Sequence, residues 1–142
     1  YQNARGLRSK LSTLFMDSFT FSSHVIVFTE TWLKPDILSS EVLADRYTIY
    51  RNDRSSRRGG GVLIAVNSNF TSELFIVQVS QDLEFLCVRL ILPGQSIYVT
   101  CSYIPPSSDV LIYEQHLSAL KTVSSSLSDK DHLIVLGDFN LP

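Results

Sequence analysis

The sequence predicts an α/β protein, and three observations carry that prediction. Short runs rich in valine, leucine and isoleucine indicate buried strands, and two longer segments space their apolar residues as amphipathic helices do. Polar residues follow several of the strands, which is where α/β proteins place their chemistry. The chain has 142 residues, of which 44% are hydrophobic and 18% charged, so it is a globular domain or part of one.

The N-terminal half is predicted to mix strands and helices. Tyr1-Gln2-Asn3 has the character of a strand end, and the helical spacing of Leu7, Leu11 and Leu14 predicts a helix over residues 5–18. The elements expected next are a strand at 25–28 leading into Thr29-Glu30, a short helix over about 36–44, a strand at 47–50, a polar loop at 51–58 and a strand at 61–66.

The C-terminal half is predicted to be mostly β-structure with one helix. The expected strands are residues 75–79, 85–92, 97–102 and 133–136. Pro93-Gly94-Gln95 should join the second and third of these as a hairpin, and the segment from Pro105 to Ser108 offers a helix cap. An amphipathic helix follows, because apolar residues recur at steps of three and four: Val110, Tyr113, Leu117, Leu120 and Val123.

Charge and cysteine usage exclude several classes of protein. The net charge is −2, so the chain as a whole is not a polycation. Cys87 and Cys101 both lie inside apolar runs and are expected to be reduced core thiols, because disulfide scaffolds use cysteine more densely. No run approaches the roughly 18 apolar residues of a membrane span, and no secretory leader is evident. Because the chain begins at Tyr1 instead of Met, we expect it to be cut at both ends.

Polar residues that could carry chemistry follow four of the predicted strands. They are Asn3, Glu30, Tyr103, and the pair Asp138 and Asn140 in a Gly-Asp-Phe-Asn sequence. Side chains alternate along a strand, so Asp138 and Asn140 are expected on one face. A single acid after a strand is typical of a helix cap or a solvated turn, but four such strand ends together indicate a site. Oxygen and amide groups of this kind suit a hard cation such as Mg²⁺.

Five motifs give the chain a family resemblance. In order they are Gln2-Asn3-Ala4-Arg5-Gly6-Leu7, Thr29-Glu30-Thr31-Trp32-Leu33, Arg58-Gly59-Gly60-Gly61-Val62, Ser102-Tyr103-Ile104-Pro105-Pro106 and Gly137-Asp138-Phe139-Asn140. Together they resemble the endonuclease domain of LINE-type (non-LTR) retrotransposons. That domain belongs to the endonuclease/exonuclease/phosphatase superfamily, with apurinic endonucleases and pancreatic deoxyribonuclease.

The resemblance implies a fold and an activity. The fold would be a four-layer sandwich of two β-sheets flanked by helices, and residues 1–142 would be the N-terminal part of that domain, without its C-terminal part. The parent would be a retrotransposon polyprotein that nicks target DNA with Mg²⁺, or with Mn²⁺ in its place. The new 3′-hydroxyl would prime reverse transcription of the element's RNA by the polyprotein's reverse transcriptase region. Its location would be the nucleus, with no secretion and no membrane.

The resemblance also implies roles for individual residues. Glu30 stands at the family's metal-ligand glutamate, and Asp138 at the aspartate that orients or deprotonates the attacking water. Asn140 matches the asparagine that helps to hold that aspartate and the phosphate. Tyr103 matches the tyrosine that contacts the scissile phosphate, and Asn3 the strand-end asparagine of the cluster. Phosphodiester hydrolysis needs such an oriented water and a cation that offsets transition-state charge.

The chain departs from the family in two places. Arg5 stands where apurinic endonucleases carry an aspartate, which argues against abasic-site specialisation. The family's C-terminal Ser-Asp-His motif, with its catalytic histidine, has no counterpart, and neither does the aspartate that precedes it. His24 and His132 each lie six residues, or roughly 20 Å of strand, before their acid. His116 is expected at the surface or the core boundary, so the chain alone is expected to be inactive.

One arginine-rich segment carries two interpretations. Arg51, Arg54, Arg57 and Arg58, with Arg46 before them, form either a solvated loop or a set of phosphate contacts along DNA, and these two interpretations weigh equally. The glycines that follow, residues 59–61, lack the Lys-Ser/Thr of a phosphate-binding loop. A close-packed entry into the next strand is the better interpretation of them.

Three interpretations of function stay open from the sequence. The first is an active retrotransposon endonuclease domain seen in part. The second is another phosphodiesterase of the superfamily, such as a lipid or inositol phosphatase, against which the arginines and the Glu-Thr-Trp-Leu motif argue. The third is a decayed remnant without activity. The flanking gene would separate them through a downstream reverse transcriptase region or through interrupting stop codons.

Overall fold

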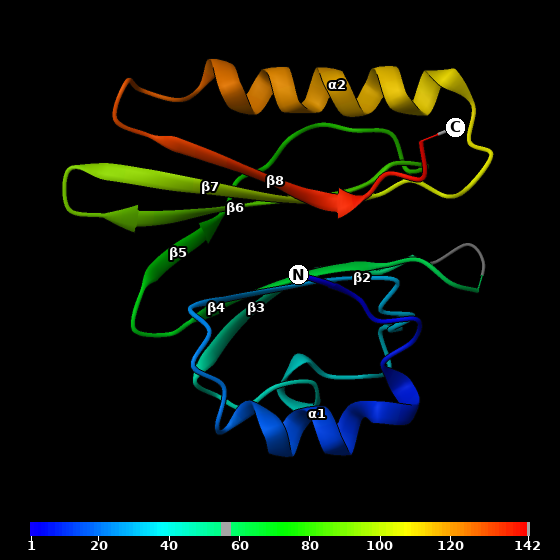
Figure 1. Ribbon diagram of the computed structural model, residues 1–142, viewed down its shortest axis with the longest axis vertical. Coiled ribbons are helices and arrows are strands. Elements are labelled where there is room, and N and C mark those ends of the chain that lie inside the picture. Colours follow the sequence, from blue (N-terminus) through cyan, green and yellow to red (C-terminus); the bar gives the residue numbers. More distant parts are fainter. Residues whose placement is uncertain (55–57, 142) are drawn as a thin grey trace.

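The computed structural model describes residues 1–54 and 58–141. Two four-stranded β-sheets lie face to face, with helix α1 (Leu11–Ser18) outside one sheet and helix α2 (Val110–Ser125) outside the other (Figure 1). The α/β class that the sequence predicts is confirmed, and so is the sandwich of two sheets flanked by helices that the family resemblance implies. Neither helix has the length and hydropathy of a membrane span within the described residues.

The first sheet has the strand order β1-β2-β4-β3. Its strands are β1 (Gln2–Asn3), β2 (Val25–Thr29), β3 (Tyr47–Asn52) and β4 (Val62–Asn67). The short strand β1 runs parallel to β2, whereas β4 is antiparallel to both of its neighbours. Residues 62–66 of β4 are all completely buried, since this strand is central and both faces of its sheet are covered.

The second sheet has the order β5-β6-β7-β8. Its strands are β5 (Thr71–Leu74), β6 (Glu84–Leu92), β7 (Gln95–Tyr103) and β8 (His132–Asp138). Strands β6 and β7 form the predicted hairpin, in which Leu92 pairs with Gln95 across Pro93-Gly94. Strand β8 returns parallel to β7 after the crossover through α2, so both strands end at the same edge of the sheet.

Apolar side chains form three layers: one under α1, one between the sheets and one under α2. Cys101 lies between the sheets and Cys87 under α2. Both thiols are buried and free, as predicted from their apolar surroundings. Burial raises the pKa of each to about 12, because the thiolate loses its hydration there.

The predicted strand at 75–79 is wrong. Strand β5 lies just before it, and Leu74 pairs with Val88 at the end of the ladder. Beyond Phe75, whose N–H still donates to the Cys87 carbonyl at 2.9 Å, the chain leaves the sheet. Every second side chain from Phe75 to Val79 packs into the layer under α2, so the alternation reflects packing without strand pairing.

The predicted helix over residues 5–18 begins later, with a 3₁₀ turn, η1, at Arg8–Lys10. Its expected first residues are drawn out beside the end of β2, because the N–H groups of Gly6 and Leu7 donate to the carbonyls of Glu30 and Thr31 at 2.8 Å. Only η2, a 3₁₀ turn at Ser39–Glu41, forms where a helix over 36–44 was expected. The three residues after it, 42–44, are all buried, which an amphipathic helix does not allow.

Two boundaries and one helix face also differ from prediction. Residues 51 and 52 of the expected polar loop belong to β3, whereas Arg57 lies outside the described residues. Helix α2 forms as predicted, but Asp109 caps it in place of the Pro105–Ser108 segment. Its buried face is rotated, so Leu117 is 64% exposed and His116 only 7% exposed. The expectation of a surface or boundary His116 is therefore wrong.

Candidate active site at the strand ends

Four strand ends meet at one edge of the sandwich. Asn3 ends β1, Glu30 follows β2, Tyr103 ends β7 and Asp138 ends β8. Because β1 is parallel to β2 and β7 to β8, each pair of side chains emerges at the same edge of its sheet. The face-to-face packing of the sheets then brings the two pairs together.

Asn3 is the centre of this cluster. Its amide nitrogen donates to Glu30 Oε1 at 3.0 Å and to Asp138 Oδ2 at 2.7 Å. Its amide oxygen accepts a hydrogen bond from the backbone N–H of Arg5 at 3.0 Å. The Arg5 contact determines which end of the amide faces the carboxylates, so one neutral side chain joins acids from two different sheets.

The two carboxylates form a site of concentrated negative charge. Glu30 Oε1 and Asp138 Oδ2 lie within about 6 Å of each other, since both bind one nitrogen, and their repulsion is about 3 kcal/mol at an effective dielectric constant near 20. Within residues 1–54 and 58–141, neither acid has an ion-pair partner. A divalent cation would relieve this repulsion.

The donor set fits Mg²⁺ or Mn²⁺. The described residues contain no cluster of three or more His, Cys, Asp or Glu side chains. Mg²⁺ commonly binds only one or two carboxylates and completes its shell with water and substrate phosphate. Glu30 and Asp138 supply two carboxylates, which suits a cation shared with a bound phosphate.

Tyr103 adds a hydrogen-bond donor to the cluster. Burial raises the pKa of its phenol above the usual value, and the negative charge of Glu30, which accepts its hydrogen bond, raises it further. The Arg54 guanidinium lies 5.5 Å from the centre of the Tyr103 ring and opposes the shift. The phenol therefore keeps its proton at neutral pH and can donate it in a hydrogen bond.

The backbone beside Glu30 is held in an unusual conformation. Glu30 and Trp32 have φ angles of 51° and 54°, which residues other than glycine rarely adopt. The N–H of Trp32 donates to the Gly60 carbonyl at 2.9 Å. A Cβ on Gly61 would lie 2.5 Å from Thr31 Oγ1, so the predicted close-packed strand entry is confirmed at this glycine. In this conformation Glu30 accepts the hydrogen bond from the Asn3 amide.

Asn140 lies beyond the end of β8, so the strand alternation used to place it beside Asp138 does not reach it. Its side-chain amide donates to the Ile104 carbonyl at 3.0 Å, and its own carbonyl accepts from the Tyr113 hydroxyl at 2.8 Å. Strand β8 ends at Asp138 and Asn140 has a φ of 41°, so strand alternation no longer applies. Its implied role toward Asp138 and phosphate stays a prediction.

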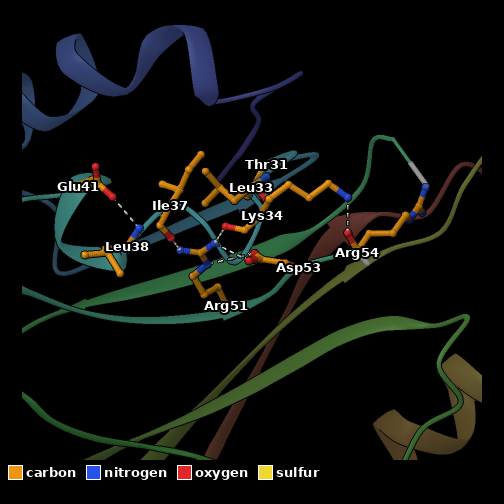
Figure 2. A network of polar contacts seen from close by, with 9 residues as sticks. All are labelled: Thr31, Leu33, Lys34, Ile37, Leu38, Glu41, Arg51, Asp53 and Arg54. Carbon is orange, nitrogen blue, oxygen red and sulfur yellow. Dashed lines mark hydrogen bonds and ion pairs between the residues drawn. The ribbon is translucent and has the colours of Figure 1, made fainter. Parts of the chain in front are cut away.

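Two of the four predicted DNA-binding arginines are tied into the protein. Arg51 donates to the carbonyls of Ile37 at 2.7 Å and Lys34 at 3.0 Å. It also pairs with Asp53, and Figure 2 shows these contacts together. The Arg51 side chain is only 13% exposed. It joins β3 to the loop that follows Trp32, and a DNA contact from it finds no support here.

Arg54 is likewise engaged, by a residue that the sequence interpretation missed. It pairs with Glu84, which is 5% exposed and also accepts a hydrogen bond from the Gly61 N–H. In the sequence, Glu84 stands out only as an acidic residue near the start of an apolar run. An acid in that position is more typical of a turn than of a buried ion pair. A buried ion pair of this kind fixes the loop, and the Arg54 charge is already paired within the protein. Among the described arginines of the set, only Arg58 stays exposed.

The histidines lie away from the carboxylates, as the sequence predicts for two of them. His24 immediately precedes β2 and His132 begins β8, both at the strand ends opposite the site. His116 is buried, and its ring contacts those of Phe85 and Phe139. Among the described residues, none of the three supplies a general base at the cluster.

Solved structures share this fold. The endonuclease domain of TRAS1, a telomere-specific non-LTR retrotransposon, is 14% identical with a TM-score of 0.67, and the match covers 96% of this chain and 57% of that one. D. rerio TDP2 complexed with single strand DNA product is 18% identical with a TM-score of 0.61, covering 95% and 53%. The human Nocturnin catalytic domain with bound sulfate is 12% identical with a TM-score of 0.63, covering 94% and 58%.

These identities show a common fold and no more. The chain spans little more than half the length of each of the three structures. None of the curated protein sequences compared with the chain matches it. A model of the endonuclease/exonuclease/phosphatase family, however, matches residues 2–142. The chain therefore belongs to the endonuclease/exonuclease/phosphatase family.

Proposed function

We propose that this chain is part of a Mg²⁺-dependent DNA endonuclease domain of a retrotransposon polyprotein. The domain would nick one strand of target DNA and leave a 3′-hydroxyl that primes reverse transcription. The observation that carries the proposal is the pair of carboxylates, Glu30 and Asp138, that converge on the Asn3 amide. The shared fold with a retrotransposon endonuclease domain supports the choice of DNA.

The side chains divide the work of phosphodiester hydrolysis. Asp138 accepts a proton from the attacking water, while its hydrogen bond from Asn3 holds it in position. When substrate binds, the Tyr103 O–H, still protonated, would turn from Glu30 and donate to a non-bridging oxygen of the scissile phosphate. Glu30, with Asp138 beside it, would hold the Mg²⁺ ion, which offsets the negative charge that develops on phosphate when it is bound.

The first experiment measures the cation without relying on activity. Mn²⁺ is titrated into the protein and followed by electron paramagnetic resonance, with Glu30→Gln and Asp138→Asn as variants. Each variant keeps the side-chain shape but loses a charged ligand, so we expect at least about tenfold weaker binding. Glu73→Gln is the matched control, because Glu73 is a half-exposed carboxylate on β5 that pairs with Arg89. Equal binding in all four proteins would refute the cation site.

The second experiment measures the reaction in the longer parent protein. Supercoiled plasmid is incubated with Mg²⁺ and the parent protein, and nicking is compared with release of phosphate from inositol phosphates and phosphoinositide vesicles. We expect plasmid nicking that falls by about 10²–10⁴ in Asp138→Ala and Glu30→Ala. Activity on the phosphoinositides alone would identify a phosphatase, and activity on neither substrate would favour a decayed remnant.

A further inference from the structure

An open pocket with a volume of about 520 Å³ lies beside the carboxylate cluster. Four cationic side chains and one aromatic ring line it. They are Arg5, Arg8, Lys34 and Arg58, with the ring of Trp32. The proposed reaction does not use any of these five residues. The pocket nevertheless adjoins the carboxylate cluster along one wall.

The position of the pocket follows from the parallel pairing of β1 and β2. Asn3 pairs with Thr29 in that ladder, so Asn3 and Glu30 leave the sheet side by side. The pocket begins two residues later on each segment, at Arg5 and at Trp32. Two residues span at most about 7 Å, so the cationic pocket is next to the carboxylates.

The positive charge in the pocket is largely uncompensated. Arg8 pairs with Asp36 at 3.3 Å, but both side chains are more than half exposed and such a pair is weak. Lys34 uses one of its three N–H groups to bind the Arg54 carbonyl at 2.9 Å. Arg5 and Arg58 are exposed, and neither has a carboxylate partner within the described part of the chain.

Trp32 is arranged as a support for Arg58. The Arg58 guanidinium lies 5.4 Å from the centre of the Trp32 ring, a cation–π distance. Gly6 packs close to the ring, because a Cβ there would lie 2.7 Å from Trp32 Cε3. The indole N–H is buried and has no partner among the described residues. The ring is therefore clamped in place, and it presents Arg58 to the pocket.

We propose that this pocket binds a backbone phosphate of the substrate strand that flanks the phosphodiester at the carboxylate cluster. Arg5 and Arg58 would contact the phosphate, and Trp32 would be a positioning residue. Phosphates of one DNA strand recur about every 3.4 Å along the helix axis, so a strand held at the carboxylates carries others within reach of the pocket. The inference rests on the proposed function, since it takes nucleic acid as the substrate.

The test is DNA binding in EDTA, which removes both the cation and the reaction from the measurement. Fluorescence anisotropy follows a labelled duplex oligonucleotide with the 142-residue chain between about 50 and 200 mM salt. Arg5→Gln and Arg58→Gln should each weaken binding and reduce the salt slope by about one, as the loss of one phosphate contact requires. Lys130→Gln is the control, because Lys130 is an exposed cation in the loop before β8 at the opposite end of the sheet.

Trp32 provides a second readout, since it is the only tryptophan of the chain. Its fluorescence should change on titration with the oligonucleotide, and the change should shrink in Arg58→Gln. Trp32→Phe keeps an aromatic support and should retain most of the affinity, whereas Trp32→Ala should resemble Arg58→Gln. Inorganic phosphate is titrated in parallel, so that a response to free phosphate without DNA binding would overturn the assignment to a polynucleotide.

Two further results would overturn the proposal: no DNA binding by the wild-type chain at low salt, or identical salt slopes in the wild type, Arg5→Gln and Arg58→Gln. Circular dichroism checks that each variant is folded, and Arg58→Gln carries the test if Arg5→Gln unfolds. If DNA binding follows the prediction but Mn²⁺ does not bind Glu30 and Asp138, the endonuclease proposal fails while the phosphate pocket stands.

Discussion

Replacing Asn3 by alanine removes the single donor that joins the two carboxylates. Two charge-assisted hydrogen bonds disappear, of 2.7 and 3.0 Å, and the repulsion between Glu30 and Asp138 is left uncompensated. Hydrogen bonds to charged groups contribute about 1.5–3 kcal/mol each, and this site is partly open to water. We therefore take the lower end, about 1.5 kcal/mol for each bond, and expect a total loss of about 3 kcal/mol in the free energy of unfolding.

Urea denaturation of Asn3→Ala in EDTA, followed by circular dichroism, measures this loss. For a domain of this size it corresponds to a fall in Tm of about 8–12 °C. Mg²⁺ should reduce the difference in unfolding free energy between Asn3→Ala and the wild type. A cation between the carboxylates would replace the missing positive end of the Asn3 amide. Asn69→Ala is the matched control, since Asn69 lies exposed in the turn after β4. The reasoning would be refuted if Asn3→Ala lost no more unfolding free energy than Asn69→Ala. It would also be refuted if Mg²⁺ left the difference from the wild type unchanged.

Three other predictions concern pH, packing and activity. Burial lowers the pKa of His116, so its contribution to stability is present above pH 6.5 and is lost as the pH falls; His116→Leu should flatten the decline in unfolding free energy between about pH 7 and 5, and an unchanged slope would contradict this. Gly61→Ala should lower the free energy of unfolding by more than about 2 kcal/mol, because Gly61 has a φ of 87° and the new Cβ would meet Thr31 Oγ1 at 2.5 Å. Thermal unfolding is compared with that of Gly94→Ala, where the space around the new Cβ is open, and equal Tm values would contradict the prediction. The 142-residue chain alone should not nick plasmid with Mg²⁺, because no described histidine reaches the carboxylates; nicking abolished by Glu30→Ala would prove it sufficient.

Local sequence determined most of the strands and the location of the site. Continuous apolar runs indicate buried strands, and such runs correctly predicted the positions of β2, β4, β6, β7 and β8. The ends of parallel strands then collect polar residues, which is how Asn3, Glu30, Tyr103 and Asp138 could be grouped from the chain alone. These inferences need only the spacing of apolar residues along each strand and the residue at which the apolar run ends.

The partners of the polar residues could not be read in the same way. Arg51 and Arg54 look like free cations in an arginine-rich segment. Their donors are instead taken by Asp53, by Glu84 and by backbone carbonyls of a loop 14 to 17 residues before Arg51. An ion pair between distant residues depends on how two sheets are stacked, which no local pattern records. The same holds for His116, which is buried because α2 turns that face toward Phe85.

The sequence by itself thus determined which side chains reach the active edge, since strand period and strand ends are local properties. Only the tertiary structure decided how those side chains are used. The stacking of two sheets made Asn3 the shared donor of two carboxylates. The alignment of β1 with β2 placed Arg5 opposite Trp32 around one pocket. Both outcomes depend on distances between segments that are remote in the chain, and such distances exist only after folding.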